Sequence, residues 1–217
     1  MFSRWFGKKR ANEGAASTGG PAGPRVPRHS GGWSALRKRL AVDDGLRVVD
    51  VGFTSPANIN CLTNLGHSVF LADLVHDAWT GNWQTGVDEK GQPVWDVEGY
   101  LNHSLQFSAR MFDVVLLWTT LDYLPEPFVV PVVSRLFDAM NRGGQVLAFF
   151  HTRTHGEETD YSRFHITAGD DVEVQAAKSF AIQRTFSNRS IEKLFANWAG
   201  HKQFLAKDSV SEVIITR

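Results

Sequence analysis

Short apolar runs alternate with stretches of helical spacing through the first two thirds of the chain. In residues 46–74, an apolar run ends at Asp50, the chain turns at Gly52, and a helix-compatible segment leads into a second apolar run. This order predicts a strand, a tight turn, a helix and a second strand. Two further apolar runs, at 112–118 and 145–151, flank a helical stripe and predict strands buried on both faces. We therefore expect βαβ units that build a parallel sheet.

The last third of the chain has a different pattern. Residues 152–186 are polar and contain a turn at 168–171 between two alternating segments, which indicates a hairpin or an insertion. Apolar residues at helical spacing then predict a helix over 191–198. The two strands predicted at 203–206 and 210–216 are joined by a link so short that they must run antiparallel.

A long polar interval at 75–92 follows the second predicted strand. Trp79, Trp83 and Trp95 lie in it or just after it. A connection of this length without clear periodicity is typical of a functional lid or a disordered loop. The tryptophans favour a lid, although burial of any one of them against the core is an equally good interpretation.

Composition limits the class of protein. The chain has 217 residues, of which 42% are hydrophobic, and a formal net charge of zero, so we expect one domain and no nucleic-acid partner. The single Cys61 cannot form an internal disulfide. No apolar run approaches the roughly 20 residues that span a bilayer, and no signal peptide is recognisable at the N-terminus. These features predict a soluble, cytoplasmic protein; its oligomeric state is left open.

Residues 1–32 are expected to form a disordered basic tail, and residues 33–217 the folded domain. The tail is rich in Gly, Ala, Ser and Pro, and its basic residues far outnumber its one acid, Glu13. Phe2, Trp5 and Phe6 precede a basic cluster at 8–10, a combination that favours weak contact with an anionic membrane or RNA. A plain solubilising extension is the main interpretation of this segment, and such contact is the alternative.

The first βαβ unit carries the strongest functional signal. Asp73 ends its second strand roughly 20 residues after the turn at Gly52, where an acidic side chain can accept hydrogen bonds from both hydroxyls of a ribose. The first turn of such a unit is where parallel sheets bind nucleotides. A nucleoside site is therefore the first hypothesis.

The chain resembles class I S-adenosylmethionine-dependent methyltransferases over roughly residues 33–217. The segments that carry the resemblance read VVDVGFTSPANINCL, VFLADL, LNHSLQFSARMFDVVLLWTTLDYLP and RGGQVLAFFH. The resemblance implies an α/β fold, a Rossmann-like three-layer sandwich with a mostly parallel seven-stranded sheet and an antiparallel C-terminal hairpin. It also implies S-adenosylmethionine as the cofactor. The acceptor is not identified, but the absence of a basic domain and the tryptophans favour a small molecule.

The resemblance also implies a set of cofactor-binding residues. Asp73 stands at the ribose position, and Asn102 stands where the family usually has an adenine-binding Asp. Trp118 and Thr119 lie where the strand predicted at 112–118 meets the cofactor. The full set is Asp50, Gly52, Thr54, Ser55, Asp73, Asn102, Trp118 and Thr119.

The glycine motif departs from the family pattern. Thr54 and Pro56 take the places of two glycines, with Ser55 between them. Glycine there permits positive φ and close approach of a ligand, whereas Pro56 removes an N–H donor. The alternative to an active enzyme is therefore an inactive methyltransferase-like module with a binding or regulatory role.

Candidate catalytic residues lie at two predicted strand ends. Asp122 and Tyr123 follow the strand predicted at 112–118, and His151 ends the strand predicted at 145–151, where such a sheet gathers its ligands. Capping, packing or surface roles are the competing interpretation. No metal site is expected, since His151 and His155 lack the Glu of the zinc-protease motif. A short-chain dehydrogenase is also disfavoured, since no tyrosine has a lysine four residues later.

Overall fold

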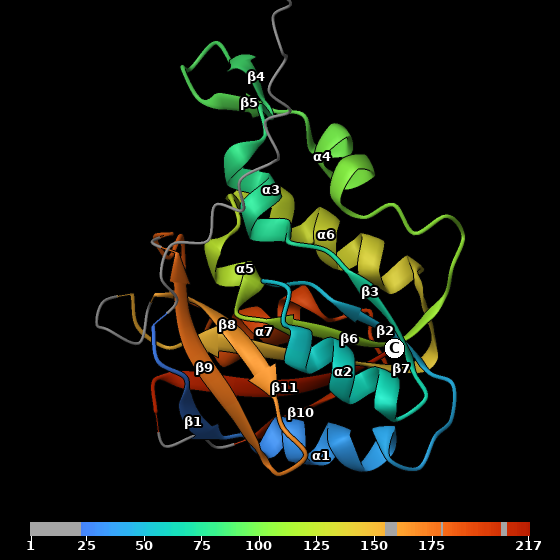
Figure 1. Cartoon of the computed structure of the whole chain (residues 1–217). Coiled ribbons are helices and arrows are strands. Elements are labelled where there is room, and N and C mark those ends of the chain that lie inside the picture. The colour runs from blue at the N-terminus through green and yellow to red at the C-terminus, as the bar shows by residue number, and fades with distance from the viewer. Residues whose placement is uncertain (1–22, 155–159, 179, 205–207) are drawn as a thin grey trace, which may run out of the picture.

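The computed structural model describes residues 23–154, 160–178, 180–204 and 208–217. A six-stranded sheet with the strand order β10-β11-β7-β6-β2-β3 forms its centre (Figure 1). Its strands are β2 (Arg47–Asp50), β3 (Ser68–Leu71), β6 (Phe112–Trp118), β7 (Met140–His151), β10 (Gly200–Phe204) and β11 (Val210–Thr216). β3, β2, β6 and β7 run parallel, and β11 is antiparallel to both β7 and β10. The expected parallel core and reversed last strand are present, but the sheet has six strands where seven were expected.

Helices cover both faces of this sheet. α1 (Gly31–Leu40) and α2 (Pro56–Asn64) pack on one face, against side chains such as Val48 and Leu116. The other face, which includes Val49 and Val115, is covered by the remaining helices. These are α3 (Leu74–Thr80), α4 (Val97–Ser104), α5 (Thr120–Tyr123), α6 (Glu126–Asp138) and α7 (Asn188–Leu194). Successive side chains along these strands point alternately into the two cores, as expected for strands that are buried on both faces.

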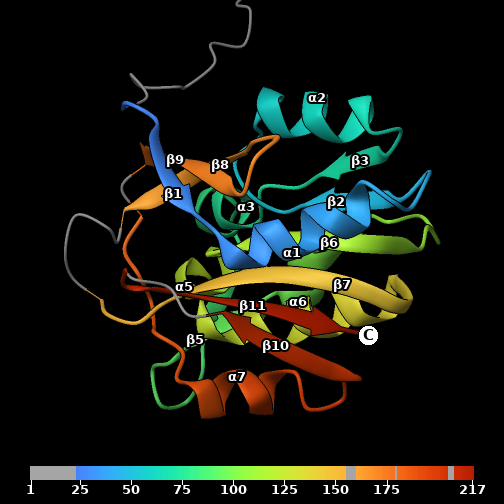
Figure 2. The same ribbon diagram turned by 90° about the horizontal axis from the view of Figure 1, so that it is seen from below.

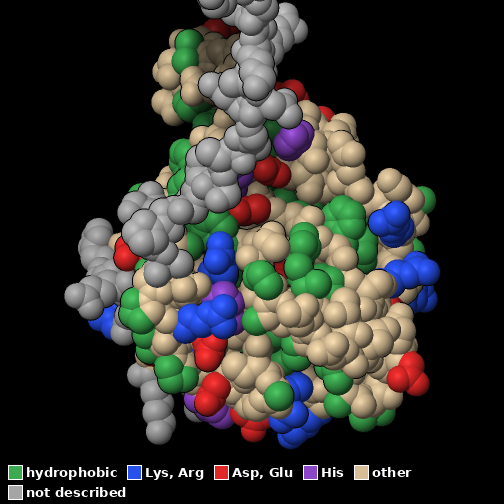
Figure 3. All heavy atoms as spheres, viewed as in Figure 1, with side chains coloured by type: hydrophobic (Ala, Val, Ile, Leu, Met, Phe, Trp, Pro, Cys, Tyr) green, Lys and Arg blue, Asp and Glu red, His purple; other side chains and the backbone are tan. Residues whose placement is uncertain are grey.

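A second sheet lies on the side of α1 and α2. It has the order β1-β9-β8 and consists of β1 (Val26–His29), β8 (Tyr161–Ile166) and β9 (Asp171–Lys178), all antiparallel. Figure 2 shows it beside α2, on the opposite side of the main sheet from α7. Basic, acidic and histidine side chains are interspersed over this sheet (Figure 3), in keeping with the ion pairs Arg25–Glu173 and His29–Asp171. The hairpin predicted within 152–186 is β8–β9.

Strand β1 lies within the segment expected to be a tail. Val26–His29 pair in register with residues 171–174 of β9, and Ser30 caps α1 by accepting a hydrogen bond from the Trp33 N–H. The ordered part therefore begins before Trp33, because β9 provides a strand edge that the sequence of residues 23–32 does not reveal. Residues 1–22, with the aromatic and basic cluster, lie outside the described residues.

The interval expected to form a lid contains α3 and a separate two-stranded hairpin, β4 (Gln84–Val87) and β5 (Pro93–Trp95). The hairpin projects beyond the rest of the domain (Figure 1). Trp83 and Trp95 pack against the core, and Trp79 donates its indole N–H to the Tyr123 carbonyl at 2.8 Å. The tryptophans thus anchor this segment to the domain. Within the described residues no helix is both long and apolar enough to cross a bilayer.

Candidate functional site

Asp50, at the end of β2, is an internal hydrogen-bond acceptor. It is 1% exposed; its Oδ1 accepts from the Trp118 indole N–H at 2.7 Å and its Oδ2 from the Asn58 amide at 2.8 Å. Burial raises the pKa of Asp50 to about 6, against the opposing effect of these two hydrogen bonds. Both carboxylate oxygens are therefore engaged by protein groups.

Trp118 covers the turn at Gly52. Its backbone has a φ of +49°, which directs the side chain away from the end of β6. A Cβ on Gly52 would lie 3.0 Å from Cδ1 of the Trp118 indole, and the ring stacks on Phe164 of β8 with 5.0 Å between centroids and 5° between planes. The space that glycine leaves at this turn is thus filled by Trp118.

The start of α2 binds β8 directly. Asn58 donates to the Phe164 carbonyl at 3.0 Å and accepts from the Ile166 N–H at 2.8 Å, so its amide pairs with the backbone of β8 as a neighbouring strand would. Ser55 caps α2 and lies 2.7 Å from Nδ1 of His165. Thr54 is exposed. The altered glycine motif therefore forms a docking face for β8.

Tyr161, the first residue of β8, lies beside both Asp73 and the turn at Gly52. Asp73 caps α3 by accepting from the His76 N–H, and the Tyr161 hydroxyl lies 3.5 Å from its Oδ1. The Tyr161 ring lies 5.0 Å from that of Phe53, next to Gly52. Tyr161 is 2% exposed. Tyr161 therefore contacts both Asp73 and Phe53, the residue that follows Gly52.

The remaining expected cofactor residues are separated. Asn102 is exposed on α4, where its Oδ1 accepts long hydrogen bonds from Arg135 of α6. None of its described contacts joins it to Asp50 or Asp73. Thr119 is buried at the end of β6 and lines a cavity on the side of the second sheet. The structure thus brings Asp50, Gly52, Ser55, Asp73 and Trp118 to one edge of the sheet and leaves Asn102 elsewhere.

Two of the three catalytic candidates form a buried pair. Nδ1 of His151 lies 2.7 Å from Oδ2 of Asp122, which also accepts the His151 backbone N–H at 2.8 Å. Burial raises the pKa of Asp122 to about 6, although the hydrogen bonds from His151 oppose that rise. Tyr123 packs edge-on against His151 at 5.8 Å, and burial raises the pKa of its hydroxyl, which stays neutral. The carboxylate of Asp122 thereby fixes the His151 ring.

A cavity of about 430 Å³ lies between the second sheet and the carboxyl ends of the main strands. His151 and Thr119 line it from the main sheet, and Ser162, Phe164 and Val174 line it from β8 and β9. Phe164 therefore has Trp118 and the Gly52 turn behind it and the cavity beside it. Among the described residues no cluster of His, Cys, Asp and Glu could hold a metal ion.

Comparison with known proteins gives structural similarity only. No family model matches, and no curated protein matches in sequence. One similar solved structure is TehB from Haemophilus influenzae, with 12% sequence identity and a TM-score of 0.46 over 84% of this chain and 61% of that one. Another is an S-adenosylmethionine-dependent methyltransferase from Methanosarcina mazei, with 15% identity and a TM-score of 0.46 over 82% of this chain and 94% of that one. A third is magnesium protoporphyrin IX methyltransferase from Synechocystis with bound S-adenosylhomocysteine, with 15% identity and a TM-score of 0.44 over 85% of this chain and 78% of that one.

The strand order itself, with the reversed β11 between β7 and β10, agrees with the resemblance found in the sequence. The fold is α/β and methyltransferase-like. S-adenosylmethionine is the cofactor that this fold implies. These three structures share no more than 15% sequence identity with this chain, and a shared fold does not determine activity.

The residues at the expected cofactor site do not fit that cofactor in this conformation. Asp50 has both oxygens engaged, the Gly52 turn is covered by Trp118, and Tyr161 stands beside Asp73. The sequence did not predict a role for Asn58 or Tyr161. Both roles depend on the position of β8, which lies more than 100 residues after Asn58, and no local sequence pattern indicates such a pairing.

Proposed function

We propose that this chain is a methyltransferase-like module with a binding role, in which β8 replaces the cofactor. The observation that supports this most is the pairing of Asn58 with the backbone of β8 at Phe164 and Ile166. Ser55, which lies between the two residues that replace glycine, also contacts β8. Beside the turn where the resemblance implies a nucleoside, the chain binds its own strand.

A second candidate function, S-adenosylmethionine-dependent methyl transfer to a small molecule, is favoured by a different observation. The Asp122–His151 pair faces the cavity, and a histidine held by a carboxylate can act as a general base toward an acceptor hydroxyl or amine. Asp50, Gly52 and Asp73 also share one edge of the sheet. This function requires β8 to move away from the turn at Gly52.

Calorimetric titration with S-adenosylhomocysteine separates the two functions. For a module in which β8 occupies the crevice, we expect no saturable heat at micromolar ligand, with the wild type and Asp73→Ala alike. Binding of a nucleoside through Asp73 would instead give a micromolar Kd that Asp73→Ala weakens about tenfold, since a lost charge-assisted hydrogen bond costs about 1.5 kcal/mol or more. Asp44→Ala, which removes an exposed carboxylate before β2, is the matched control. A micromolar Kd sensitive only to Asp73→Ala would overturn the binding-module proposal.

A further inference from the structure

The cavity between the two sheets is a mostly apolar space at the carboxyl edge of the main sheet, and it is partly open to solvent. Its apolar walls come from β1, β8, β9 and β11 and include Val26, Pro27, Phe164, Val174, Ala176 and Val210. A volume of about 430 Å³ falls within the range of small-molecule sites. β1, β8 and β9 pair with one another in the second sheet, whereas Val210 comes from β11 of the main sheet. Asp160 and Asp208 complete the lining from positions just before β8 and β11.

The charges on its walls favour a cation. The one basic residue on the wall, Arg28, forms a two-point ion pair with Asp208, at 2.6 and 3.1 Å, and a second ion pair with the buried Glu212. Its charge is therefore neutralised before any ligand arrives. Asp160 also lies on the wall, and within the described part of the chain its carboxylate has no hydrogen-bond or ion-pair partner.

The aromatic surface points to the same class of ligand. Phe164 presents its ring to the cavity while it stacks on Trp118 behind, which holds the ring in place. A fixed aromatic ring binds planar apolar groups and attracts a nearby cation by its negative face. Thr119 and His151 add polar groups on the main-sheet side.

We infer that this cavity binds a small apolar cation, such as an aromatic or alkyl amine, with its ammonium group at Asp160. The inference rests on the binding role proposed above and names the class of ligand. An anionic molecule of the same shape is disfavoured, since the wall carries two carboxylates against one guanidinium that is already paired. Neither Asp73 nor the turn at Gly52 is among the lining residues, so this binding does not require S-adenosylmethionine.

The test is calorimetric or NMR titration of the full chain, without S-adenosylmethionine, with three ligands of similar shape: tryptamine, 3-methylindole and indole-3-propionate. We expect tryptamine to bind about tenfold more tightly than indole-3-propionate, with 3-methylindole between them. Asp160→Asn should weaken tryptamine about three- to fivefold, the range for one exposed ion pair, and leave 3-methylindole unchanged.

Ala176→Trp fills the cavity from an exposed position on β9 and should abolish binding of all three ligands. The control is Val87→Trp, which adds the same side chain on the remote β4. Equal or tighter binding of indole-3-propionate, absence of saturable binding, or tryptamine binding that survives Ala176→Trp would each overturn the inference. Because no adenosyl ligand is present, these outcomes are independent of the S-adenosylhomocysteine titration.

Discussion

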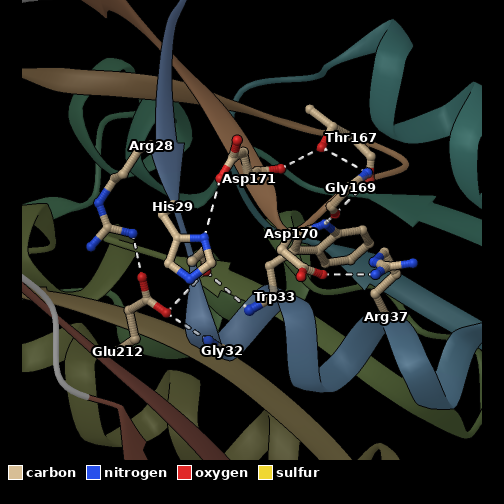
Figure 4. A network of polar contacts seen from close by, with 11 residues as sticks. Arg28, His29, Gly32, Trp33, Arg37, Thr167, Gly169, Asp170, Asp171 and Glu212 are labelled. Atoms are coloured by element: carbon tan, nitrogen blue, oxygen red, sulfur yellow. Dashed lines mark hydrogen bonds and ion pairs between the residues drawn. The ribbon is translucent and has the colours of Figure 1, made fainter.

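Replacing Arg28 by Met lowers the free energy of unfolding by about 3–5 kcal/mol, the range for breaking a buried ion pair from one side. Glu212 is 0% exposed on β11, and its charge is balanced by Arg28 of β1 (Figure 4). Its other oxygen accepts from the Ser30 hydroxyl at 2.9 Å and from the Gly32 N–H at 2.7 Å. Met keeps the apolar stem of Arg28 but leaves the carboxylate buried without a cation.

The pKa of Arg28 agrees with this role. Burial lowers the pKa, but the hydrogen bonds and charges of Asp208 and Glu212 outweigh that effect, and the pKa lies above its ordinary value. The ion pair joins β1 to β11 and therefore the second sheet to the main sheet. Loss of this ion pair should therefore open the cavity wall as well as lower the free energy of unfolding.

Urea unfolding of Arg28→Met beside Arg25→Met measures this effect. Arg25 pairs with Glu173 just before the same strand, but both side chains are more than one third exposed, so the control should lose no more than about 1 kcal/mol. Similar losses in the two variants would contradict the role assigned to the Arg28–Glu212 pair.

Replacing Asn58 by Ala lowers the free energy of unfolding by about 3 kcal/mol, since three buried groups lose their hydrogen-bond partner together. These groups are Oδ2 of Asp50, the Phe164 carbonyl and the Ile166 N–H. The side chain is 0% exposed, so water cannot readily take its place. The variant should also loosen β8 from the turn.

Asn60→Ala is the matched control for Asn58→Ala. Asn60 lies on the same helix with an exposed side chain, and its removal should change the free energy of unfolding by less than about 0.5 kcal/mol. Equal, small effects in the two variants would mean that the bridge from α2 to β8 contributes little to stability.

The parallel core of the fold could be predicted from the sequence because each βαβ unit consists of consecutive residues. The apolar runs that end at Asp50 and Trp118 became β2 and β6, and the run at 145–151 lies within β7. The expected edge positions of Asp50, Gly52 and Asp73 also follow from this local order, since carboxyl ends of parallel strands meet at one edge.

What could not be predicted depends on pairing between distant segments. β1 has no strong strand pattern of its own and is ordered by β9, about 145 residues later. Tyr161 and Phe164 lie beside the Gly52 turn, where Ser55 and Asn58 bind β8. The missing seventh strand has a similar cause, because the segment after α3 pairs within itself as β4 and β5. Long-range pairings of this kind carry no periodic signal.

The measurement that tests the central claim most directly is hydrogen–deuterium exchange of the Ile166 amide, with and without saturating S-adenosylmethionine. A strand fixed at the turn by Asn58 predicts protection comparable with that of the Leu147 amide in the centre of β7, unchanged by the ligand. Rapid exchange of the Ile166 amide, or a change in its protection when S-adenosylmethionine is added, would contradict the account by showing that β8 leaves the crevice.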